Sequence, residues 1–277
     1  MPIDLDGVKP FLTYPGGKFK YADVLPVPEH FVKYIEPFVG SGGMLFALQP
    51  DKFIINDMNC DLINLYRHIR NHCNNLINIT KKLSQDKKTF LDIGGLMNNN
   101  RKGLNVLERA AYYLYLSKLS FNGHLNFKND GKYVLAYSRF WNKTVVDEKN
   151  LSKVSSLLKR GRIECKDYID ILKEARKGDF VFLDPPYITN TQKIYNDDWN
   201  MGNDEENMEY HHELYNELLK LDRRGVSFTL TYNFHPDLYK IYKSSPFYIL
   251  FTEKNHTIVH YIRNRKYKEM IVYNFHF

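Results

Sequence analysis

A run of four apolar residues, 180–183, ends abruptly in the tetrapeptide Asp184-Pro185-Pro186-Tyr187. Such a run predicts a buried parallel strand whose last residues enter a rigid loop. Ligands of open α/β sheets bind at the carboxyl ends of strands. We therefore expect an α/β fold with its binding site at Asp184, although an ordinary strand followed by a proline turn would look the same locally.

The chemistry of this tetrapeptide favours a nucleobase amine as the ligand. Proline lacks an N–H and has a fixed φ, so the Pro185 carbonyl is a bare acceptor beside the Asp184 carboxylate. Two such acceptors beside an aromatic ring suit a planar group that carries an NH2. Its nitrogen is a poor nucleophile, and accepting both hydrogens draws it toward a reactive, tetrahedral shape. Because the amine becomes positive only as it attacks, a carboxylate can stabilise it, and neither a metal nor a strong base is needed.

The composition favours a polyanionic partner. The 277 residues carry a net charge of +7 and include 21 Tyr and 18 Phe, which suits phosphates and stacked bases. Cys60, Cys73 and Cys165 are far apart and form no CxxC pair, so we expect neither a disulfide scaffold nor a zinc site. No apolar signal core or membrane-length run is present, so we expect a soluble, intracellular protein of the cytoplasm.

Two glycine-rich turns precede the apolar run. The first, residues 11–18, closes in Lys18, where the glycines permit close backbone approach and the lysine can reach an anion. A plain surface turn is the alternative. In the second, a strand at 33–37, a glycine loop at 38–43 and a helix at 44–48 form a nucleotide-binding opening. Leu45 occupies the place of the third glycine of the dinucleotide fingerprint, which argues against NAD.

A second strand, residues 53–55, ends at Asn56-Asp57. A carboxylate at that strand end can accept hydrogen bonds from both ribose hydroxyls of an adenosine ligand. Asp57 could equally be a helix N-cap, and the two roles are compatible.

Some 105 residues separate this strand from the next one, at 162–165, which is too long for a simple crossover and predicts an insertion. Apolar residues in it recur at helical spacing, and turn residues around 121–124 and 128–132 predict a hairpin. A helix at 208–221, a strand at 226–231 and an antiparallel pair at 247–252 and 268–275 complete the prediction.

Five segments, in this order, resemble the Dam-type, alpha-group family of DNA adenine N6 methyltransferases. They are Tyr14-Pro15-Gly16-Gly17-Lys18, Tyr34-Ile35-Glu36-Pro37-Phe38-Val39-Gly40, Asn56-Asp57-Met58-Asn59, Phe121-Asn122-Gly123 and Asp184-Pro185-Pro186-Tyr187. The resemblance implies a Rossmann-like, S-adenosylmethionine-dependent methyltransferase sheet with an inserted, mostly helical target-recognition domain that contains a β-hairpin. Residues 1–66 and 158–277 would form the catalytic domain and residues 67–157 the insertion.

The resemblance also implies a role for each matching residue. Catalysis falls to Asp184, Pro185 and Tyr187, with the target adenine flipped out of the duplex and stacked on Tyr187. Contacts with S-adenosylmethionine fall to Tyr14, Gly16, Lys18, Glu36, Phe38, Gly40, Asp57, Asp167 and Asp184. Contacts with DNA fall to Asn122, His124, Asn126, Lys128, Lys132, Tyr137 and Arg139, although a solvated hairpin would have a similar composition.

The recognition sequence stays open. Members of the family that read GATC carry an arginine where this chain has Asn126 and a proline where it has Ala136. Arginine is the favoured reader of guanine, whereas asparagine prefers adenine. We therefore do not assume GATC.

The function expected from the sequence is site-specific methylation of adenine N6 in double-stranded DNA, with no membrane and no obligatory protein partner. The alternatives are an RNA-directed base methyltransferase and a DNA-binding module that has lost catalysis. Cytosine N4 methylation usually goes with serine at the position of Asp184, and glutamine methylation with asparagine. A decayed enzyme would have no reason to retain Asp184, Tyr187, Asp57 and Lys18 together.

Overall fold

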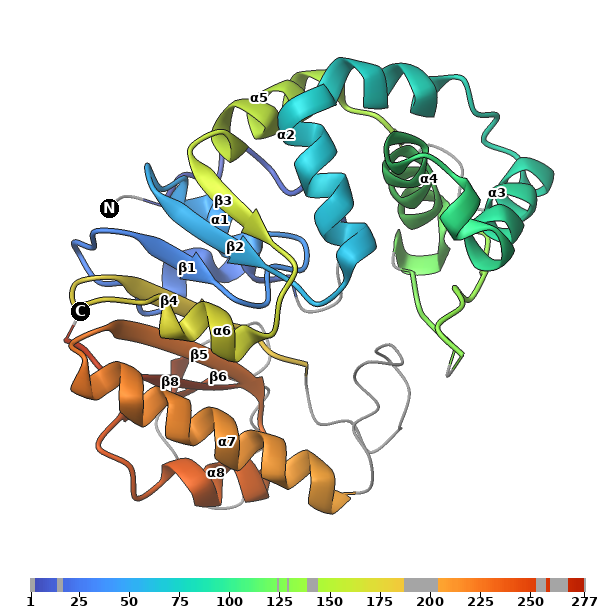
Figure 1. The fold of residues 1–277 in the computed structure, drawn as a ribbon. Coiled ribbons are helices and arrows are strands. Elements are labelled where there is room, and N and C mark those ends of the chain that lie inside the picture. The colour runs from blue at the N-terminus through green and yellow to red at the C-terminus, as the bar shows by residue number, and fades with distance from the viewer. Residues whose placement is uncertain are drawn as a thin grey trace.

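The apolar runs of the sequence form one mixed sheet in the computed structural model (Figure 1), which describes residues 3–13, 17–123, 125–128, 130–138, 144–186, 204–252, 258–259 and 269–276. Within these ranges the sheet has eight strands in the order β3-β2-β1-β4-β5-β8-β6-β7. Their bounds are β1 Tyr34–Glu36, β2 Phe53–Asn56, β3 Gly161–Glu164, β4 Phe180–Leu183, β5 Ser227–Asn233, β6 Tyr248–Thr252, β7 Ile258–Val259 and β8 Glu269–Tyr273. The expected α/β fold is confirmed.

The strand that ends at Asp184 lies in the middle of the sheet. Strand β4 pairs in parallel with β1 on one side and with β5 on the other, and all four of its residues are buried. Strand β1 pairs in parallel with β2 on its other side, and β2 with β3. The chain thus proceeds outward in one direction through β2 and β3 and in the other through β4 and β5. The place where the direction reverses, between β1 and β4, is where open sheets bind ligands.

Residues of the central strands alternate between two hydrophobic cores, because successive side chains of a strand point to opposite faces. One face carries Tyr34, Phe53, Ile55, Phe180 and Phe182, which pack with α1, α2 and α5. The other carries Ile35, Ile54, Val181 and Leu183, which pack with α6, α7 and α8. Buried on both sides, these strands read as continuous apolar runs.

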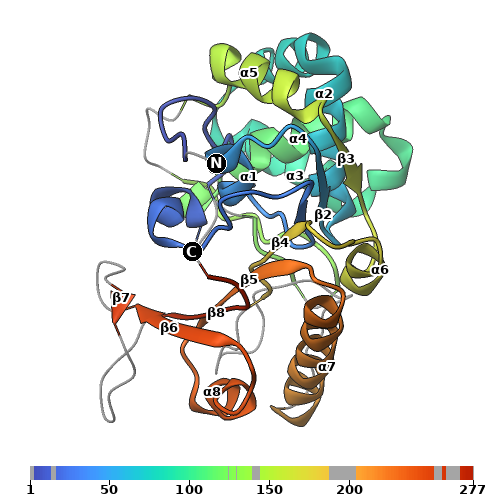
Figure 2. The ribbon, with the colours of Figure 1, turned by 90° about the vertical axis from the view of Figure 1, so that its left-hand side faces the viewer.

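Helices cover both faces of the sheet, as Figure 2 shows for α7 and α1. The helix bounds are α1 Gly43–Leu48, α2 Cys60–Lys81, α3 Lys87–Asn99, α4 Val106–Leu119, α5 Glu148–Leu158, α6 Tyr168–Lys173, α7 Asp204–Arg223 and α8 Pro236–Tyr242, with short 3-10 helices η1 Lys18–Val24, η2 Arg101–Gly103 and η3 Phe121–Gly123. None of the helices in the described ranges is both long enough and apolar enough to cross a membrane.

The expected antiparallel pair at the end of the chain is confirmed. Strand β8 runs antiparallel between β5 and β6, and the short β7 pairs with β6. Strand β8 is buried throughout, which is consistent with its position inside the sheet.

The insertion leaves the sheet after β2 and returns at β3. Helix α2 packs against both α4 and α5, and α3 packs against α4. Helix α2 runs across the boundary expected at residue 66, so the division into 1–66 with 158–277 and 67–157 stays a prediction. The expected hairpin is present as antiparallel pairing of Phe127 with Tyr133, with a second isolated bridge between Ser120 and Tyr137.

The cysteines differ from the expectation. Cys60 and Cys165 form a disulfide across a sequence separation of 105 residues, with their Cα atoms 5.6 Å apart, so the expectation of no disulfide is wrong. Cys60 begins α2 and Cys165 directly follows β3. The parallel register of Asn56 with Glu164 brings these two strand ends together, which spacing in the sequence does not reveal. Cys73 carries a free thiol.

A buried histidine gives the fold a pH dependence. His211, in α7, is fully buried with its Nδ1 2.9 Å from the Tyr232 hydroxyl of β5. Burial lowers the pKa of His211 from its ordinary 6.5 to about 4. Between these values the unfolded chain binds a proton that the folded chain does not, so stability is fully present above pH 6.5 and is lost as the pH falls toward 4.

We predict that the free energy of unfolding falls by roughly 3 kcal/mol between pH 6.5 and pH 4 through His211 alone, at about 1.4 kcal/mol per pH unit. Urea unfolding of the wild type and of His211→Gln at several pH values isolates this contribution, because other titrating groups cancel in the difference. A difference between the two proteins that does not change with pH would contradict the prediction.

Candidate active site

Asp184 leaves the end of β4 already held in place by two side chains. Lys18 Nζ lies 2.9 Å from each of its carboxylate oxygens, and the Thr231 hydroxyl of β5 donates to Oδ1 at 2.8 Å. A carboxylate offers about four acceptor positions, so Oδ2 keeps room for one further donor. Asp184 therefore has a fixed orientation and can still accept a hydrogen bond from a ligand.

Lys18 is a buried cation rather than part of a surface turn. Its side chain is 2% exposed, and besides Asp184 it lies 3.5 Å from Glu269 Oε1 of β8. Two carboxylates thus share one ammonium group, which compensates their burial. The surface-turn alternative for Lys18 is excluded, while Tyr14 and Gly16 of the same motif lie outside the described residues.

Glu36, the last residue of β1, has an acceptor that nothing in the described part of the chain satisfies. Its side chain is 2% exposed, and its Oε2 has no hydrogen-bond partner there. Burial raises the pKa of Glu36 well above its ordinary value, and the Asp184 carboxylate adds to the rise. A buried acceptor without a partner, at the point where the sheet reverses direction, indicates a ligand that donates a hydrogen bond or carries a positive charge.

The glycine loop after β1 folds back onto the end of β2. The Val39 N–H donates to the Asn56 carbonyl at 2.8 Å, and the Tyr66 hydroxyl of α2 donates to the Gly40 carbonyl at 3.0 Å. Gly40 and Gly42 have φ of +46° and +71°, in the left-handed region that favours glycine. This shape keeps the backbone of the loop close to the carboxyl end of β2.

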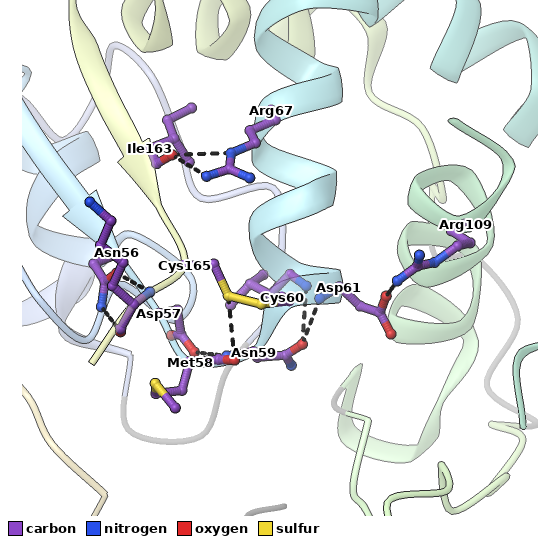
Figure 3. The surroundings of a disulfide bond; sticks show 12 residues. Asn56, Asp57, Met58, Asn59, Cys60, Asp61, Arg67, Arg109, Ile163 and Cys165 are labelled. Carbon is purple, nitrogen blue, oxygen red and sulfur yellow. Dashed lines mark hydrogen bonds and ion pairs between the residues drawn. A yellow bond between two sulfur atoms is a disulfide. The ribbon is translucent and has the colours of Figure 1, made fainter. Parts of the chain in front are cut away.

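Asp57 ties this loop to the start of α2. Its Oδ2 accepts from the Gly40 N–H at 3.0 Å and its Oδ1 from the Asn59 N–H at 2.9 Å. Burial raises the pKa of Asp57. The N-cap of α2 is Asn59, which accepts from the N–H groups of Asp61 and Leu62, so the alternative of Asp57 as the N-cap is wrong (Figure 3). The Asp57 carboxylate keeps acceptor positions for a ligand.

Asn56 is a site residue for which the sequence predicted no role of its own. Its fully buried amide donates to the Pro37 carbonyl at 3.0 Å and to the Lys166 carbonyl at 2.9 Å, and it accepts from the Lys166 N–H. One side chain therefore holds together the loops that follow β1 and β3. Its place in the segment Asn56-Asp57-Met58-Asn59 was the available signal.

Phe38 and Asp167 lie in the two loops that Asn56 holds together, the loop after β1 and the loop after β3. Asp167 is the N-cap of α6 and accepts from the Ile169 N–H at 2.8 Å. The ring of Phe38 packs on that of Tyr168, with centroids 5.3 Å apart. Phe38 and Asp167, both expected from the resemblance to bind the cofactor, thus follow the ends of β1 and β3.

Thr231 and Glu269 are the other residues that the sequence reading missed. Both belong to strands whose neighbours carry the site: Thr231 lies in β5, next to β4, and Glu269 begins β8, next to β5. For Glu269 the signal was a charged residue in an otherwise apolar strand, whereas β5 contains several polar residues and gave no such signal for Thr231. Pro185 follows Asp184 in the described ranges, whereas Tyr187 lies outside them.

The candidate DNA contacts lie on the insertion. Asn126, Lys128 and Lys132 are all exposed, and the Lys128 N–H donates to the Lys132 carbonyl at 2.8 Å. The Tyr137 hydroxyl donates to the Gln85 carbonyl at 2.7 Å, which anchors that residue to the α2–α3 connection. The side chain of Asn122, together with His124 and Arg139, lies outside the described residues.

Comparison with known proteins identifies the family. The model of the D12 class N6 adenine-specific DNA methyltransferases matches residues 14–264. The chain belongs to this family. The expected Dam-type resemblance is thereby confirmed, as are the methyltransferase fold and an enzyme class that acts on adenine N6 in DNA.

Three relatives illustrate the similarity. The chain is 33% identical over 194 residues to a type II methyltransferase, M1.LlaDCHI, from Lactococcus lactis subsp. cremoris, which covers 65% of this chain and 66% of that protein. It is 30% identical over 259 residues to the type II methyltransferase M.MjaIII from Methanocaldococcus jannaschii, covering 85% and 88%. It is 25% identical over 181 residues to the DNA adenine methylase of Escherichia coli, covering 64% of each.

The packing of the site gives a prediction at Gly43, the first residue of α1. A Cβ at this position would lie 2.8 Å from the Phe19 backbone nitrogen and 3.0 Å from that of Lys18. We expect Gly43→Ala to lower the free energy of unfolding by about 1–3 kcal/mol, because backbone cannot yield as a flexible side chain does. Urea unfolding measures the change.

Gly95, in α3, is the matched control, because a Cβ there would have no atom within 4 Å. Gly95→Ala should leave stability unchanged or raise it by up to about 1 kcal/mol, since alanine favours the helix. Equal stabilities of the two variants would contradict this account of the packing between α1 and η1.

Proposed function

We propose that the protein transfers the methyl group of S-adenosylmethionine to the N6 amine of an adenine in duplex DNA, in the crevice where β1 and β4 end. Two available acceptors carry this proposal. Asp184 Oδ2 has room for one more donor, and the buried Glu36 Oε2 has no hydrogen-bond partner in the described ranges. These two carboxylates lie at the ends of the neighbouring strands β4 and β1. Between these strands, the direction in which the chain adds strands to the sheet reverses.

The residues present fit S-adenosylmethionine. The Glu36 Oε2, without a partner in the described ranges, suits the ammonium group of the methionine part. The Asp57 carboxylate suits the ribose hydroxyls, while Phe38 and Asp167 follow the same edge of the sheet and suit the adenine. When bound, the cofactor supplies a methyl group on a positively charged sulfur. The buried Glu36 and the half-buried Asp57 carboxylates also favour a cationic ligand, because desolvation raises the pKa of each.

The side chains around Asp184 prepare it to receive an amine. Lys18 and Thr231 restrict the rotation of its carboxylate, so that its remaining acceptor position and the Pro185 carbonyl can take the two hydrogens of an exocyclic amine. As the nitrogen attacks, it gains positive charge, which the Asp184 carboxylate stabilises before a proton leaves the nitrogen. Tyr187, outside the described residues, stays the predicted platform on which the flipped base stacks.

The insertion is the proposed DNA-contacting part of the protein. Residues 67–157 would carry Asn122, His124, Asn126, Lys128, Lys132, Tyr137 and Arg139 to the duplex, with the lysines on phosphates and Asn126 toward a base. Residues 1–66 and 158–277 would carry the chemistry. The net charge of +7 supports a polyanionic substrate.

The experiment that tests the function incubates the protein with plasmid DNA from a host without adenine methylation, together with S-adenosylmethionine. We expect N6-methyldeoxyadenosine, measured by mass spectrometry of the digested nucleosides. Asp184→Ala should reduce its formation at least a hundredfold, because both the amine contact and the charge stabilisation are lost.

Asp170→Ala is the control for this experiment. Asp170 is an exposed carboxylate of α6 whose ion pair with Lys173 lies at the surface. Its loss should leave the yield within twofold of the wild type. Unchanged methylation by Asp184→Ala, or a methylated base other than adenine, would overturn the proposal.

A second prediction concerns cofactor binding. Asp57→Asn removes the charge and one acceptor from the end of β2, so we expect the dissociation constant of S-adenosylhomocysteine to rise at least tenfold, or about 1.4 kcal/mol. Isothermal titration calorimetry without DNA measures it. Asp51→Asn, at an aspartate just before the same strand with a side chain 95% exposed, should bind as the wild type does. Equal affinities of the two variants would exclude Asp57 from the cofactor site.

A further inference from the structure

Asp61, the second residue of α2, is a buried carboxylate that joins three parts of the insertion. Its side chain is 4% exposed, and Arg109 of α4 donates to its Oδ1 at 2.6 Å. Arg101 of η2 lies 3.3 Å from Oδ2, and the Tyr133 hydroxyl donates to the same oxygen. One carboxylate thus compensates two guanidinium groups and orients a phenol.

Tyr133 fixes the hairpin that carries the candidate DNA contacts. It is the partner of Phe127 in the antiparallel bridge, and its ring packs on that of Phe127 with centroids 4.9 Å apart. The Asn98 side chain binds its backbone N–H at 2.7 Å and its carbonyl at 3.1 Å. Arg101 stacks over the Tyr133 ring at 4.9 Å. Tyr133 is 1% exposed, so this one buried residue is a major attachment of the hairpin, beside the bridge of Tyr137 with Ser120.

The other side of Asp61 leads to the cofactor site. The Asp61 N–H donates to Asn59 Oδ1 at 3.1 Å, and the Asn59 N–H donates to Asp57. The Asn59 amide also donates to the Tyr113 hydroxyl of α4 at 3.1 Å. Figure 3 shows the Asp61 side chain directed at Arg109, on the opposite side of the segment from Asp57. Residues 57–61 thus contact the glycine loop at one end and the hairpin support at the other.

We propose that Asp61 is a positioning residue for DNA recognition: it holds the hairpin around Tyr133 at a fixed place relative to the cofactor-binding segment 57–61. The proposal rests on the function proposed above. Within the described ranges the two arms around the lysines pair at one bridge, Phe127 with Tyr133, so the contacts that fix Tyr133 from outside also fix the position of Lys128 and Lys132. The Asp61 carboxylate can hold the Tyr133 hydroxyl in place because its ion pairs with Arg101 and Arg109 restrict its own rotation.

The test compares Asp61→Asn with Asp179→Asn, which also removes the charge of a buried ion pair. Asp179 is 3% exposed and lies 3.0 Å from Lys33, but it precedes β4 and so lies at the end of that strand away from Asp184. Two readouts are the dissociation constant for a fluorescent mixed-sequence duplex, by anisotropy, and that for S-adenosylhomocysteine without DNA. Steady-state methylation of the plasmid DNA is a third.

We expect Asp61→Asn to weaken duplex binding about tenfold and to raise KM for DNA to a similar extent, with kcat within threefold of the wild type. Binding of S-adenosylhomocysteine should stay within twofold. Asp179→Asn should change neither affinity, although both variants lower the midpoint of thermal unfolding. This division between KM and kcat is what a purely structural role would not produce.

Tyr133→Phe is a second, milder variant that tests the same contact if Asp61→Asn does not fold. It removes only the hydroxyl that contacts Asp61 and keeps the ring under Arg101, so it should weaken duplex binding about threefold with S-adenosylhomocysteine binding unchanged. Duplex affinity equal to the wild type in this variant, or equal in Asp61→Asn and Asp179→Asn, overturns the proposal. A parallel loss of both affinities also overturns it, because the damage would then be general.

The two proposals fail in different ways. If the wild type forms no N6-methyldeoxyadenosine, the proposed function fails, while the comparison of duplex affinities still decides the role of Asp61. If the wild type methylates DNA and Asp61→Asn binds the duplex as Asp179→Asn does, only the role of Asp61 fails.

Discussion

The ion pair of Lys18 with Asp184 connects the start of the chain to the middle of its sheet. Removing one partner of a buried pair commonly costs about 3–5 kcal/mol, because the other charge is left without compensation. Here the lysine also neutralises Glu269, so two carboxylates, one after β4 and one at the start of β8 on the other side of β5, depend on it. The pair holds Asp184 in one orientation, and the candidate chemistry of the protein requires that orientation.

Besides this pair, the ends of β1 and β2 carry two further carboxylates, Glu36 and Asp57. Glu36 is buried and Asp57 is half-buried, and desolvation raises the pKa of each. A folded protein tolerates such groups where a bound ligand supplies the missing donors or positive charge. This electrostatic balance, together with the glycine loop and the family to which the chain belongs, is the physical basis for proposing a cationic nucleoside cofactor and an amine at this site.

The sequence predicted the sheet well because its signals are local. Residues 180–183 are an apolar run and residues 226–231 alternate apolar with hydroxyl-bearing side chains, and both form central strands. The disulfide between Cys60 and Cys165 could not be predicted from spacing, since the parallel register of β2 and β3 joins residues that are 105 positions apart. The turn that ends in Lys18 likewise had two interpretations from the sequence, a surface turn or an anion contact. Only the burial of Lys18 beside Asp184 decided between them.

The sequence by itself determined the order of the motifs, the family, the insertion after the second strand and most of the residues proposed for the site, because these depend on residue type and on short-range spacing. The tertiary structure alone decided which of these residues meet. Thr231 and Glu269 reach the site through strand pairing, and Asp61 reaches Tyr133 across 72 residues through the packing of α2 with α4. Such contacts depend on where the chain returns in space, and no local pattern encodes that.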